Sequence, residues 1–301
     1  MKRKLLFIFN PNSGKGKIKN FLYEIIDRFT TEDYEVTVYP TKKTGDCRDK
    51  ISSSANMYNL VVVSGGDGTI NEAVTGMLEL PKAQRVPMVY IPSGKINDFA
   101  STNKIPPSPL DAVEQIINND YVSYDIGCFN DKNFIYVAAF GAFADVPYET
   151  PQHNKNILGA TAYFLEGIKS LPKIKGIGVD ILTDTGDHVN TEAYLVLIMN
   201  STSVAGIGFG NFYDINTNDG QFEIVIVSYS INLIDLTKNI NKIKSGSTDL
   251  QGIQIVKAAN ATIRTSEPVK WTLDGEYGGE TDTVTFKVEH NAVDFVINKN
   301  K

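Results

Sequence analysis

Cysteine is scarce in this sequence, and long apolar runs are absent. The chain has only Cys47 and Cys128, with neither a CxxC pair nor a Cys/His cluster. This spacing excludes a disulfide framework and a structural zinc site, and it fits a reducing, cytoplasmic location. No stretch approaches the roughly 20 apolar residues that span a bilayer. Leu5–Phe9 follows a basic start, but the run is too short for a signal peptide and ends in a polar turn.

Dense basic blocks and basic–aromatic alternation are also lacking. The net charge is −6 over 301 residues, whereas a general nucleic-acid binder carries a basic face. We therefore expect no nucleic-acid partner. With 42% hydrophobic and 21% charged residues, the composition is that of an ordinary globular protein, and the length favours two hydrophobic cores over one.

The first half alternates short apolar runs with helix-compatible segments. Leu5–Phe9, Val36–Tyr39, Leu60–Val63 and Met88–Ile91 have the length and β-branched content of buried strands. Helical periodicity recurs between them, for instance over residues 18–29. Such alternation predicts a parallel sheet with helices on its faces, which binds ligands at the carboxyl ends of its strands. Each polar loop that follows a strand is therefore a candidate site.

The most glycine-rich of these loops lies between Leu60–Val63 and a helix expected over Asn71–Leu80. It reads Gly65-Gly66-Asp67-Gly68-Thr69. Three glycines in four positions allow positive φ and close approach of a ligand, and amides at a helix start favour an anion. The loop therefore predicts phosphate binding. A ligand-free Asp-Gly turn is the alternative, although a hairpin would continue into a second strand.

Two further loops leave strands at the same edge of the sheet. The loop over residues 10–17 does not match the Walker A pattern Gly-x-x-x-x-Gly-Lys-Ser/Thr. Asn10, Ser13 and the amides near Gly14 are nevertheless candidates to bind a nucleotide, with a plain surface turn as the alternative. The loop over Pro92–Ala100 again combines a glycine turn with a carboxylate. These loops can therefore form one site.

The second half changes to short, β-rich runs. The expected strands are Phe134–Ala139, Ile177–Leu182, Ala193–Met199, Phe222–Val227, Ala261–Thr265, Val269–Leu273, Thr283–Val288 and Val293–Ile297. Many strands with turns between them predict a β-sandwich, interrupted by helices near residues 157–171 and 231–243. We therefore expect an α/β domain over residues 1–127, which carries the candidate phosphate loops, and a β-sandwich domain over residues 128–301, whose last residues can pack back on the first domain.

Three motifs taken together resemble the catalytic family of diacylglycerol kinases, a group of soluble bacterial lipid kinases related to sphingosine kinases. They are Asn10-Pro11-Asn12-Ser13-Gly14, Gly65-Gly66-Asp67-Gly68-Thr69-Ile70-Asn71-Glu72 and Pro92-Ser93-Gly94-Lys95-Ile96-Asn97-Asp98-Phe99-Ala100. The third motif matches the family's Pro-x-Gly-Thr-x-Asn-Asp-Phe-Ala except at Lys95. The resemblance implies a doubly wound parallel-sheet nucleotide domain, similar to phosphofructokinase and NAD kinase, followed by a β-sandwich domain for the lipid.

The resemblance also implies ATP and Mg²⁺ as cofactors and assigns residues to them. It places the nucleotide at Asn10, Ser13, Gly14, Thr41, Gly65, Gly66, Asp67, Gly68, Thr69, Asn71, Gly94, Lys95 and Asn97. Asp67 and Asp98, both counted as catalytic, would organise magnesium through water together with Asp125, since magnesium keeps much of its hydration shell. A structural magnesium is expected at Asn216, Asp219 and Gln221, with a metal-free turn as the alternative.

The late motif Asp-Gly-Glu completes the expected site. The resemblance places the general base at Glu276, and phosphorylation of an alcohol requires a carboxylate within hydrogen-bond reach of the attacking hydroxyl. Lys95 stands where the family has a threonine that touches the nucleotide. It either disturbs ATP at this position or adds a cation beside the phosphates.

The expected activity is an ATP-dependent transfer of the γ-phosphoryl group to a lipid hydroxyl at the membrane surface. The protein would be cytoplasmic or peripheral at the inner membrane face, and its acceptor would enter near Phe140–Tyr148 and the helix over residues 157–171. Diacylglycerol, a sphingoid base, phosphatidylglycerol and a polyprenol all remain open as acceptors. A homodimer is also open.

A soluble-substrate kinase of the NAD kinase or phosphofructokinase kind is one alternative function, but it predicts neither the third motif nor Asp-Gly-Glu. A nucleotide-binding regulatory protein without turnover is the other, and Lys95 motivates it.

Overall fold

The structure is a computed structural model that describes residues 2–117, 121–141, 175–204, 207–208, 215–231, 235, 238–239, 242 and 250–297. The chain divides into two compact units. Unit 1 comprises Met1–Tyr124 and Asn291–Lys301, and unit 2 comprises Asp125–His290. Two strands, β5 (Tyr121–Phe129) and β15 (Glu276–Val296), carry the chain from one unit to the other.

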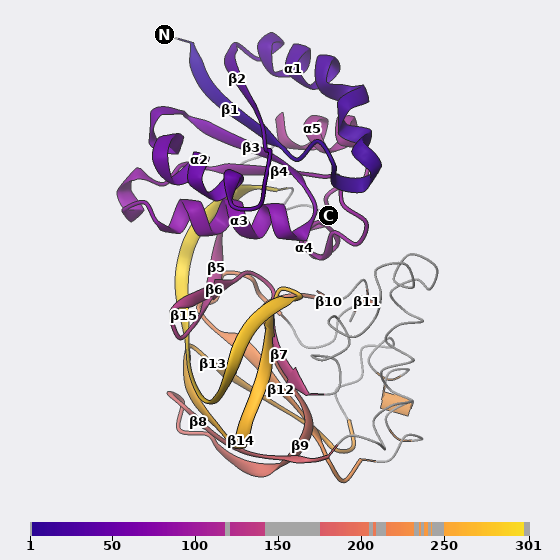
Figure 1. Ribbon diagram of the computed structural model, residues 1–301, viewed down its shortest axis with the longest axis vertical. Coiled ribbons are helices and arrows are strands. Elements are labelled where there is room, and N and C mark those ends of the chain that lie inside the picture. The colour runs from indigo at the N-terminus through magenta and orange to yellow at the C-terminus, as the bar shows by residue number, and fades with distance from the viewer. Residues whose placement is uncertain are drawn as a thin grey trace. The chain divides into compact units, whose positions relative to one another are not determined.

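Unit 1 is built on a parallel sheet (Figure 1). Its strands are β1 (Arg3–Phe9), β2 (Tyr34–Pro40), β3 (Leu60–Gly65) and β4 (Met88–Pro92), in the order β2-β1-β3-β4. The end of β15 adds to β4, where Phe295 pairs with Met88 in parallel. β3 and β4 are buried along their whole lengths. This explains the apolar runs Leu60–Val63 and Met88–Ile91, since the strands of a parallel sheet are covered on both faces.

Helices follow the strands of unit 1 in turn. They are η1 (Ser13–Phe21), α1 (Leu22–Thr31), α2 (Asp46–Ser54), η2 (Ala55–Met57), α3 (Asp67–Leu78), η3 (Lys82–Gln84), α4 (Asp98–Thr102) and α5 (Pro109–Ile117). α1 packs against α5, and α2 packs against α3. Ile25 and Phe29 of α1 are buried, as their four-residue spacing predicts. Phe99 of α4 packs on Tyr124 and Phe295, with ring centroids 5.4 and 4.6 Å apart.

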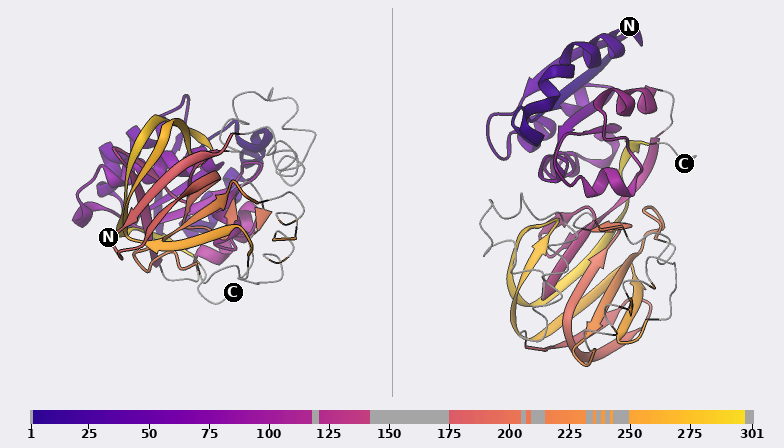
Figure 2. Two further views of the ribbon diagram at one scale, coloured as in Figure 1. Left: turned by 90° about the horizontal axis from the view of Figure 1, so that it is seen from below. Right: turned by 90° about the vertical axis from the view of Figure 1, so that its right-hand side faces the viewer.

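Unit 2 is antiparallel and rich in strands. Besides parts of β5 and β15 it contains β6 (Lys132–Phe134), β7 (Val137–Gly141), β8 (Ile177–Thr183), β9 (His188–Met199), β10 (Ser203–Val204), β11 (Ile207–Gly208), β12 (Phe222–Ser228), β13 (Ile253–Ala258) and β14 (Asn260–Leu273). The first halves of β9 and β14 pair with β8, and their second halves pair with β7. β7, β9, β8 and β14 therefore form a closed circuit around one core (Figure 2), and β12 and β13 extend it beyond β9.

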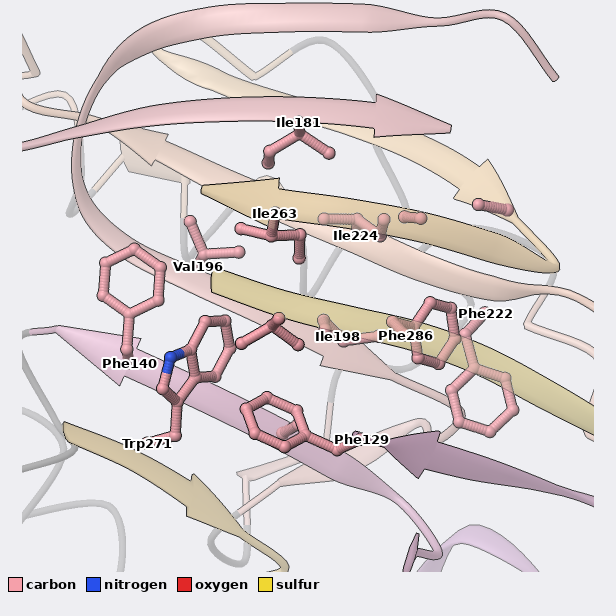
Figure 3. Packing of buried hydrophobic residues seen from close by; sticks show 14 of the residues in the cluster. Phe129, Phe140, Ile181, Val196, Ile198, Phe222, Ile224, Ile263, Trp271 and Phe286 are labelled. Atoms are coloured by element: carbon pink, nitrogen blue, oxygen red, sulfur yellow. The ribbon is translucent and has the colours of Figure 1, made fainter. Parts of the chain in front are cut away.

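One apolar cluster fills unit 2 (Figure 3). Trp271 is fully buried and lies between Phe129 and Phe140, with ring centroids 4.9 and 4.8 Å away. Phe222 and Phe286 continue the cluster, 5.5 Å apart. The sequence contains a single tryptophan, so tryptophan fluorescence reports on the core of unit 2.

Four expected strands merge into two. Ala261–Thr265 and Val269–Leu273 both belong to β14, and Thr283–Val288 and most of Val293–Ile297 belong to β15. The register between these two strands shifts inside β14, between residues 264 and 269. The polar residues that separate the two apolar runs of β14 therefore form an irregularity within one strand rather than a turn, as a bulge adds residues without ending the pairing.

Some expectations fall on parts of the chain that the structure leaves undescribed. The helix predicted over residues 157–171, most of the helix over 231–243 and the segment 142–148 lie outside the described residues. The division at residues 127 and 128 stays a prediction. None of the helices in the described ranges is long and apolar enough to cross a membrane.

Both cysteines are shielded from reaction. Cys47 is buried and Cys128 is half-buried. Burial raises the pKa of each thiol, and the nearby carboxylate of Glu72 raises that of Cys47 further. Because the thiolate is the reactive form, we expect the folded protein to react with an aromatic disulfide reagent much more slowly at neutral pH than the denatured protein, in which both thiols should react. Rapid reaction of two thiols in native buffer would contradict this burial.

Candidate functional site

The first loop, over residues 10–17, follows β1 and contacts the loop over Pro92–Ala100. The amide of Asn10 donates to the carbonyl of Ser64 at 2.8 Å, which ties the loop to β3. Gly14 and the two residues after it have φ between 55 and 71°, a left-handed region that glycine enters at little cost. A Cβ atom on Gly14 would lie 1.8 Å from the carbonyl oxygen of Ser93. Glycine at this position therefore permits direct backbone contact between the two loops.

The second loop is part of a helix. The sequence predicted a helix from Asn71, but α3 begins at Asp67, because Gly66 has an extended N-cap conformation and its carbonyl accepts the amide of Thr69 at 2.9 Å. A Cβ atom on Gly65 would lie 2.3 Å from the side chain of Thr69. The predicted nucleotide residues from Asp67 to Asn71 therefore occupy the first turns of α3, where helix amides favour an anion.

Asn97 connects the second loop to the third. It has a φ of 57°, and its amide donates to the carboxylate of Asp67 at 2.9 Å. Its side chain accepts the amide of Gly94 at 3.0 Å and donates to the carbonyl of the same residue at 3.1 Å. A Cβ atom on Gly94 would lie 2.6 Å from the Cα atom of Gly66. The three predicted loops thus meet in unit 1, as expected from their position after neighbouring parallel strands.

Tyr90 contacts two of these loops through its hydroxyl group. No feature of the sequence predicted this role. It lies in the buried strand β4, and its hydroxyl contacts the carbonyl oxygen of Gly65 at 2.9 Å and the side-chain oxygen of Asn97 at 3.1 Å. Burial, and then the charge of Asp67, raise the pKa of this phenol well above its usual value. The hydroxyl therefore keeps its single proton, which it can donate to the carbonyl of Gly65 or to the side-chain oxygen of Asn97.

Replacing Tyr90 by phenylalanine is expected to lower the free energy of unfolding by about 1 kcal/mol, the usual net value of one hydrogen bond. Tryptophan fluorescence would miss this loss, because Trp271 lies in unit 2 and Tyr90 in unit 1. Far-UV circular dichroism in urea should therefore measure the stability, and hydrogen exchange of the β3 and β4 amides should become faster. Tyr23→Phe is the control, since Tyr23 is 75% exposed. Equal free energies of unfolding for the two variants would contradict a stabilising role of the Tyr90 hydroxyl.

The predicted nucleotide residue Thr41 lies in a loop held by a carboxylate. Its amide donates to the carbonyl of Phe9 at 3.0 Å, which places it at the end of β1. The buried side chain of Asp46 accepts the amides of Lys42 and Lys43 at 2.6 and 3.1 Å. Asp46, which the sequence did not mark, thus fixes the backbone that follows Thr41.

Glu72, the last residue of the second motif, points to α2. Its two carboxylate oxygens accept the amides of Gly45 and Cys47, at 2.8 and 3.3 Å. A carboxylate at a helix N-terminus satisfies amides that have no partner within the helix and complements the helix dipole. Glu72 therefore couples α3 to the helix that begins directly after the loop of Thr41.

Asp67 and Asp98 are the two candidate magnesium aspartates of unit 1, and each begins a helix. Asp67 and Asp98 are the first residues of α3 and α4, after the neighbouring strands β3 and β4. Magnesium binds through one or two carboxylates, phosphate oxygens and water, so this donor set fits the ion. Lys95, in the turn before α4, is exposed.

Asp125, the third aspartate expected to organise magnesium, has its hydrogen-bond partners in unit 2. It belongs to unit 2 and lies inside β5 rather than at a strand end. Its side chain is fully buried; one oxygen accepts the amide of Gly220 at 2.6 Å and the other lies 2.9 Å from Nδ1 of His290. Its amide donates to the carbonyl of Thr217 at 2.8 Å. The expected part of Asp125 in organising magnesium stays a prediction.

The loop expected to hold a structural magnesium packs beside Asp125. Asp219 accepts the amide of Gln221 at 3.0 Å, and its second oxygen lies 3.9 Å from the ammonium of Lys257. Lys257 also forms an ion pair with the buried Glu223 at 3.0 Å. Burial is the main cause that raises the pKa of the Glu223 carboxyl. The described residues contain no cluster of three His, Cys, Asp or Glu side chains that could hold a metal. The loop offers one carboxylate, and its magnesium stays a prediction.

Glu276 is the first residue of β15 and follows a two-residue turn. Leu273 of β14 pairs with it, and its side chain is exposed. An exposed carboxylate at a strand start is available to a substrate, which is what the predicted role as base requires. The neighbouring Asp274 is buried instead.

Comparison with known proteins gives matches along the whole chain. The diacylglycerol kinase catalytic domain matches residues 4–129, and the YegS C-terminal NAD kinase beta sandwich-like domain matches residues 137–297. A diacylglycerol kinase of Staphylococcus saprophyticus is 33% identical over 284 residues, which are 93% of this chain and 91% of that protein. One of Staphylococcus carnosus is 34% identical over 93% of this chain and 90% of its own. The crystal structure of a diacylglycerol kinase from Bacillus anthracis aligns with a TM-score of 0.84 and 25% identity, covering 99% of this chain and 98% of that one.

These matches confirm several predictions. The fold class is an α/β nucleotide domain followed by a β-rich domain of the NAD kinase sandwich type. The enzyme class is a phosphotransferase with an alcohol group as acceptor, and use of ATP follows from the kinase family. The roles of single residues, magnesium, the location and a dimer stay predictions. With one third of its residues identical to those relatives over 93% of its length, the chain belongs to the diacylglycerol kinase catalytic domain family.

Proposed function

We propose that the protein transfers the γ-phosphoryl group of ATP to the hydroxyl of a membrane lipid, with diacylglycerol as the first candidate. The observation that carries this proposal is the junction of three glycine loops in unit 1, in a chain whose relatives are named diacylglycerol kinases. A soluble-substrate kinase shares the Gly-Gly-Asp-Gly motif only, so it accounts for fewer of these contacts.

The residues of unit 1 bind and orient the triphosphate. The glycines at positions 14, 66 and 94 let the three loop backbones approach without side chains between them. The amides at the start of α3 attract the negatively charged phosphates. Asp67 and Asp98 would hold magnesium, which would supply positive charge beside the phosphates. Asn97 keeps Asp67 in place through its amide. Positioning and electrostatic stabilisation are the main contributions that a protein makes to phosphoryl transfer.

Glu276 accepts the proton of the lipid hydroxyl. As the hydroxyl oxygen forms its bond to the γ-phosphorus, the bond from that phosphorus to the bridging oxygen breaks, and ADP leaves with the electron pair. The proton passes to the carboxylate and then to water. A base of this kind contributes roughly 10²- to 10⁴-fold to the rate.

The lipid acceptor sets the location of the enzyme. A hydroxyl next to acyl chains is presented at a membrane surface, so we propose a cytoplasmic enzyme that acts at the inner face of the membrane. A homodimer is compatible with this proposal and is not required by it.

Incubation with labelled ATP and magnesium over a panel of vesicles tests the function. The panel contains diacylglycerol, a sphingoid base, phosphatidylglycerol or a polyprenol in the same carrier lipid, and Glu276→Gln is the control protein. We expect label in phosphatidic acid from the diacylglycerol vesicles only when the unaltered enzyme is present. ATP binding without transfer to any of these lipids would favour a regulatory protein instead.

A further inference from the structure

The hairpin turn before Glu276 has an unusual central residue. β14 ends at Leu273 and β15 begins at Glu276, so Asp274 and Gly275 form a two-residue turn with φ of 49 and 85°. A turn with two positive φ values favours the sequence Asp-Gly and normally exposes its side chains to water. Asp274 is only 7% exposed, so its side chain does more than satisfy the turn.

The carboxylate of Asp274 accepts three successive backbone amides. One oxygen accepts the amide of Ile135 at 2.7 Å, and the other accepts those of Tyr136 and Val137 at 3.0 and 3.1 Å. The backbone of Asp274 adds two bonds to the same segment: its amide donates to the carbonyl of Val137 at 2.8 Å, and its carbonyl accepts the hydroxyl of Tyr136 at 3.0 Å. Hydrogen bonds to a buried carboxylate are stronger than neutral ones, so the turn is clamped to residues 135–137.

The segment that receives Asp274 is itself fixed. Ile135, Tyr136 and Val137 are at most 5% exposed; the first two connect β6 to β7, and Val137 begins β7. The carbonyl of Tyr136 accepts the amide of Asn200 at 3.0 Å, and the fully buried side chain of Asn200 donates to the carbonyl of Asp125 at 3.2 Å. One hydrogen-bonded network inside unit 2 therefore joins the turn of Glu276 to the backbone of Asp125.

We infer that Asp274 is a positioning residue, which holds the turn so that Glu276 reaches the acceptor hydroxyl in one orientation. The inference rests on the proposed role of Glu276 as the general base. An exposed glutamate on an unsupported two-residue turn would sample many positions, and a base displaced by about 1 Å loses roughly 100-fold in rate. The three amides remove that freedom, because they fix the backbone two residues before the base.

Asp274→Asn tests the inference on the full-length enzyme. The amide group of asparagine replaces one acceptor oxygen by a donor, so at least one of the three backbone amides loses its bond. We expect kcat on diacylglycerol vesicles to fall about 10- to 100-fold, while the KM for ATP stays within about threefold, because ATP is assigned to unit 1. Hydrogen exchange should become faster at residues 135–137 and 275–277, and the fluorescence of Trp271 should show that the core of unit 2 remains folded.

Two further variants separate positioning from stability. Asp131→Asn changes an exposed aspartate in the turn between β5 and β6 of the same unit and should retain full kcat. Tyr136→Phe removes only the hydroxyl that donates to Asp274, so we expect a smaller loss of kcat with normal folding; it also serves if Asp274→Asn does not fold. Unchanged kcat in both Asp274→Asn and Tyr136→Phe, with Glu276→Gln inactive, would overturn the positioning role alone. Full activity of Glu276→Gln would overturn the proposed base, and the positioning role with it.

Discussion

Replacing Glu276 by glutamine is expected to lower kcat for lipid phosphorylation by roughly 10²- to 10⁴-fold. Glutamine keeps the size and the hydrogen-bonding reach of the side chain but cannot take a proton from the attacking hydroxyl. Glu276 is exposed at the start of β15, so stability should change by no more than about 0.5 kcal/mol. Steady-state kinetics on diacylglycerol vesicles measure the loss, and the KM for ATP should stay close to its original value.

The matched control for Glu276 lies on the same strand. Glu280 is also an exposed glutamate of β15, and Glu280→Gln should leave kcat unchanged. Titration calorimetry should show that Glu276→Gln still binds ATP, which would separate loss of chemistry from loss of binding. Normal turnover by Glu276→Gln would instead mean that another group accepts the proton.

The parallel sheet of unit 1 could be predicted because burial leaves a direct mark on the sequence. Strands β3 and β4 are buried throughout, and Leu60–Val63 and Met88–Ile91 are runs without a charged residue, since both faces of the sheet are covered. The contacts among the loops left no such mark. Tyr90 lies in an apolar run like any core tyrosine, and only the register of β4 against β3, where Tyr90 pairs with Val63, places its hydroxyl near Gly65.

Two acidic residues of the second motif, Asp67 and Glu72, contact different parts of unit 1, and the motif alone did not predict this. Glu72 closes the second motif, but its carboxylate faces α2 and binds the amides of Gly45 and Cys47. Asp67, five residues earlier on the same helix, accepts the amide of Asn97. Residues of one short motif can thus serve different neighbours, because a helix turns successive side chains toward different directions.

The second half was harder to predict because its contacts join distant parts of the chain. Asp274 binds amides about 137 to 139 residues earlier in the sequence, and Asp125 binds an amide 95 residues later. Spacing within a motif carries no information about such partners. The β-rich character could be predicted, whereas the continuity of β14 and the position of Asp125 inside β5 depended on strand pairing.

Replacing Gly14 by alanine is expected to weaken ATP binding at least about tenfold, which corresponds to 1.4 kcal/mol. Gly14 has a φ of 55°, a conformation that costs an L-residue roughly 1–2 kcal/mol. The added Cβ atom would also lie 1.8 Å from the carbonyl oxygen of Ser93. Ser93 cannot move freely, because its amide donates to the carbonyl of Gly65 at 2.8 Å. The first loop must therefore move away from the other two, and titration calorimetry with ATP and magnesium measures the consequence.

Gly186→Ala is the control that carries the same backbone cost without the contact. Gly186 has a φ of 89° in the turn between β8 and β9, and a Cβ atom there would meet no atom of the described residues within 4 Å. This variant should lose thermal stability but bind ATP normally. Since both substitutions impose a left-handed alanine, Gly186→Ala shows whether a general loss of stability alone lowers the affinity for ATP. If Gly14→Ala binds ATP as tightly as Gly186→Ala, that contact does not shape the nucleotide site, and the phosphates depend on the loops of Gly66 and Gly94 alone.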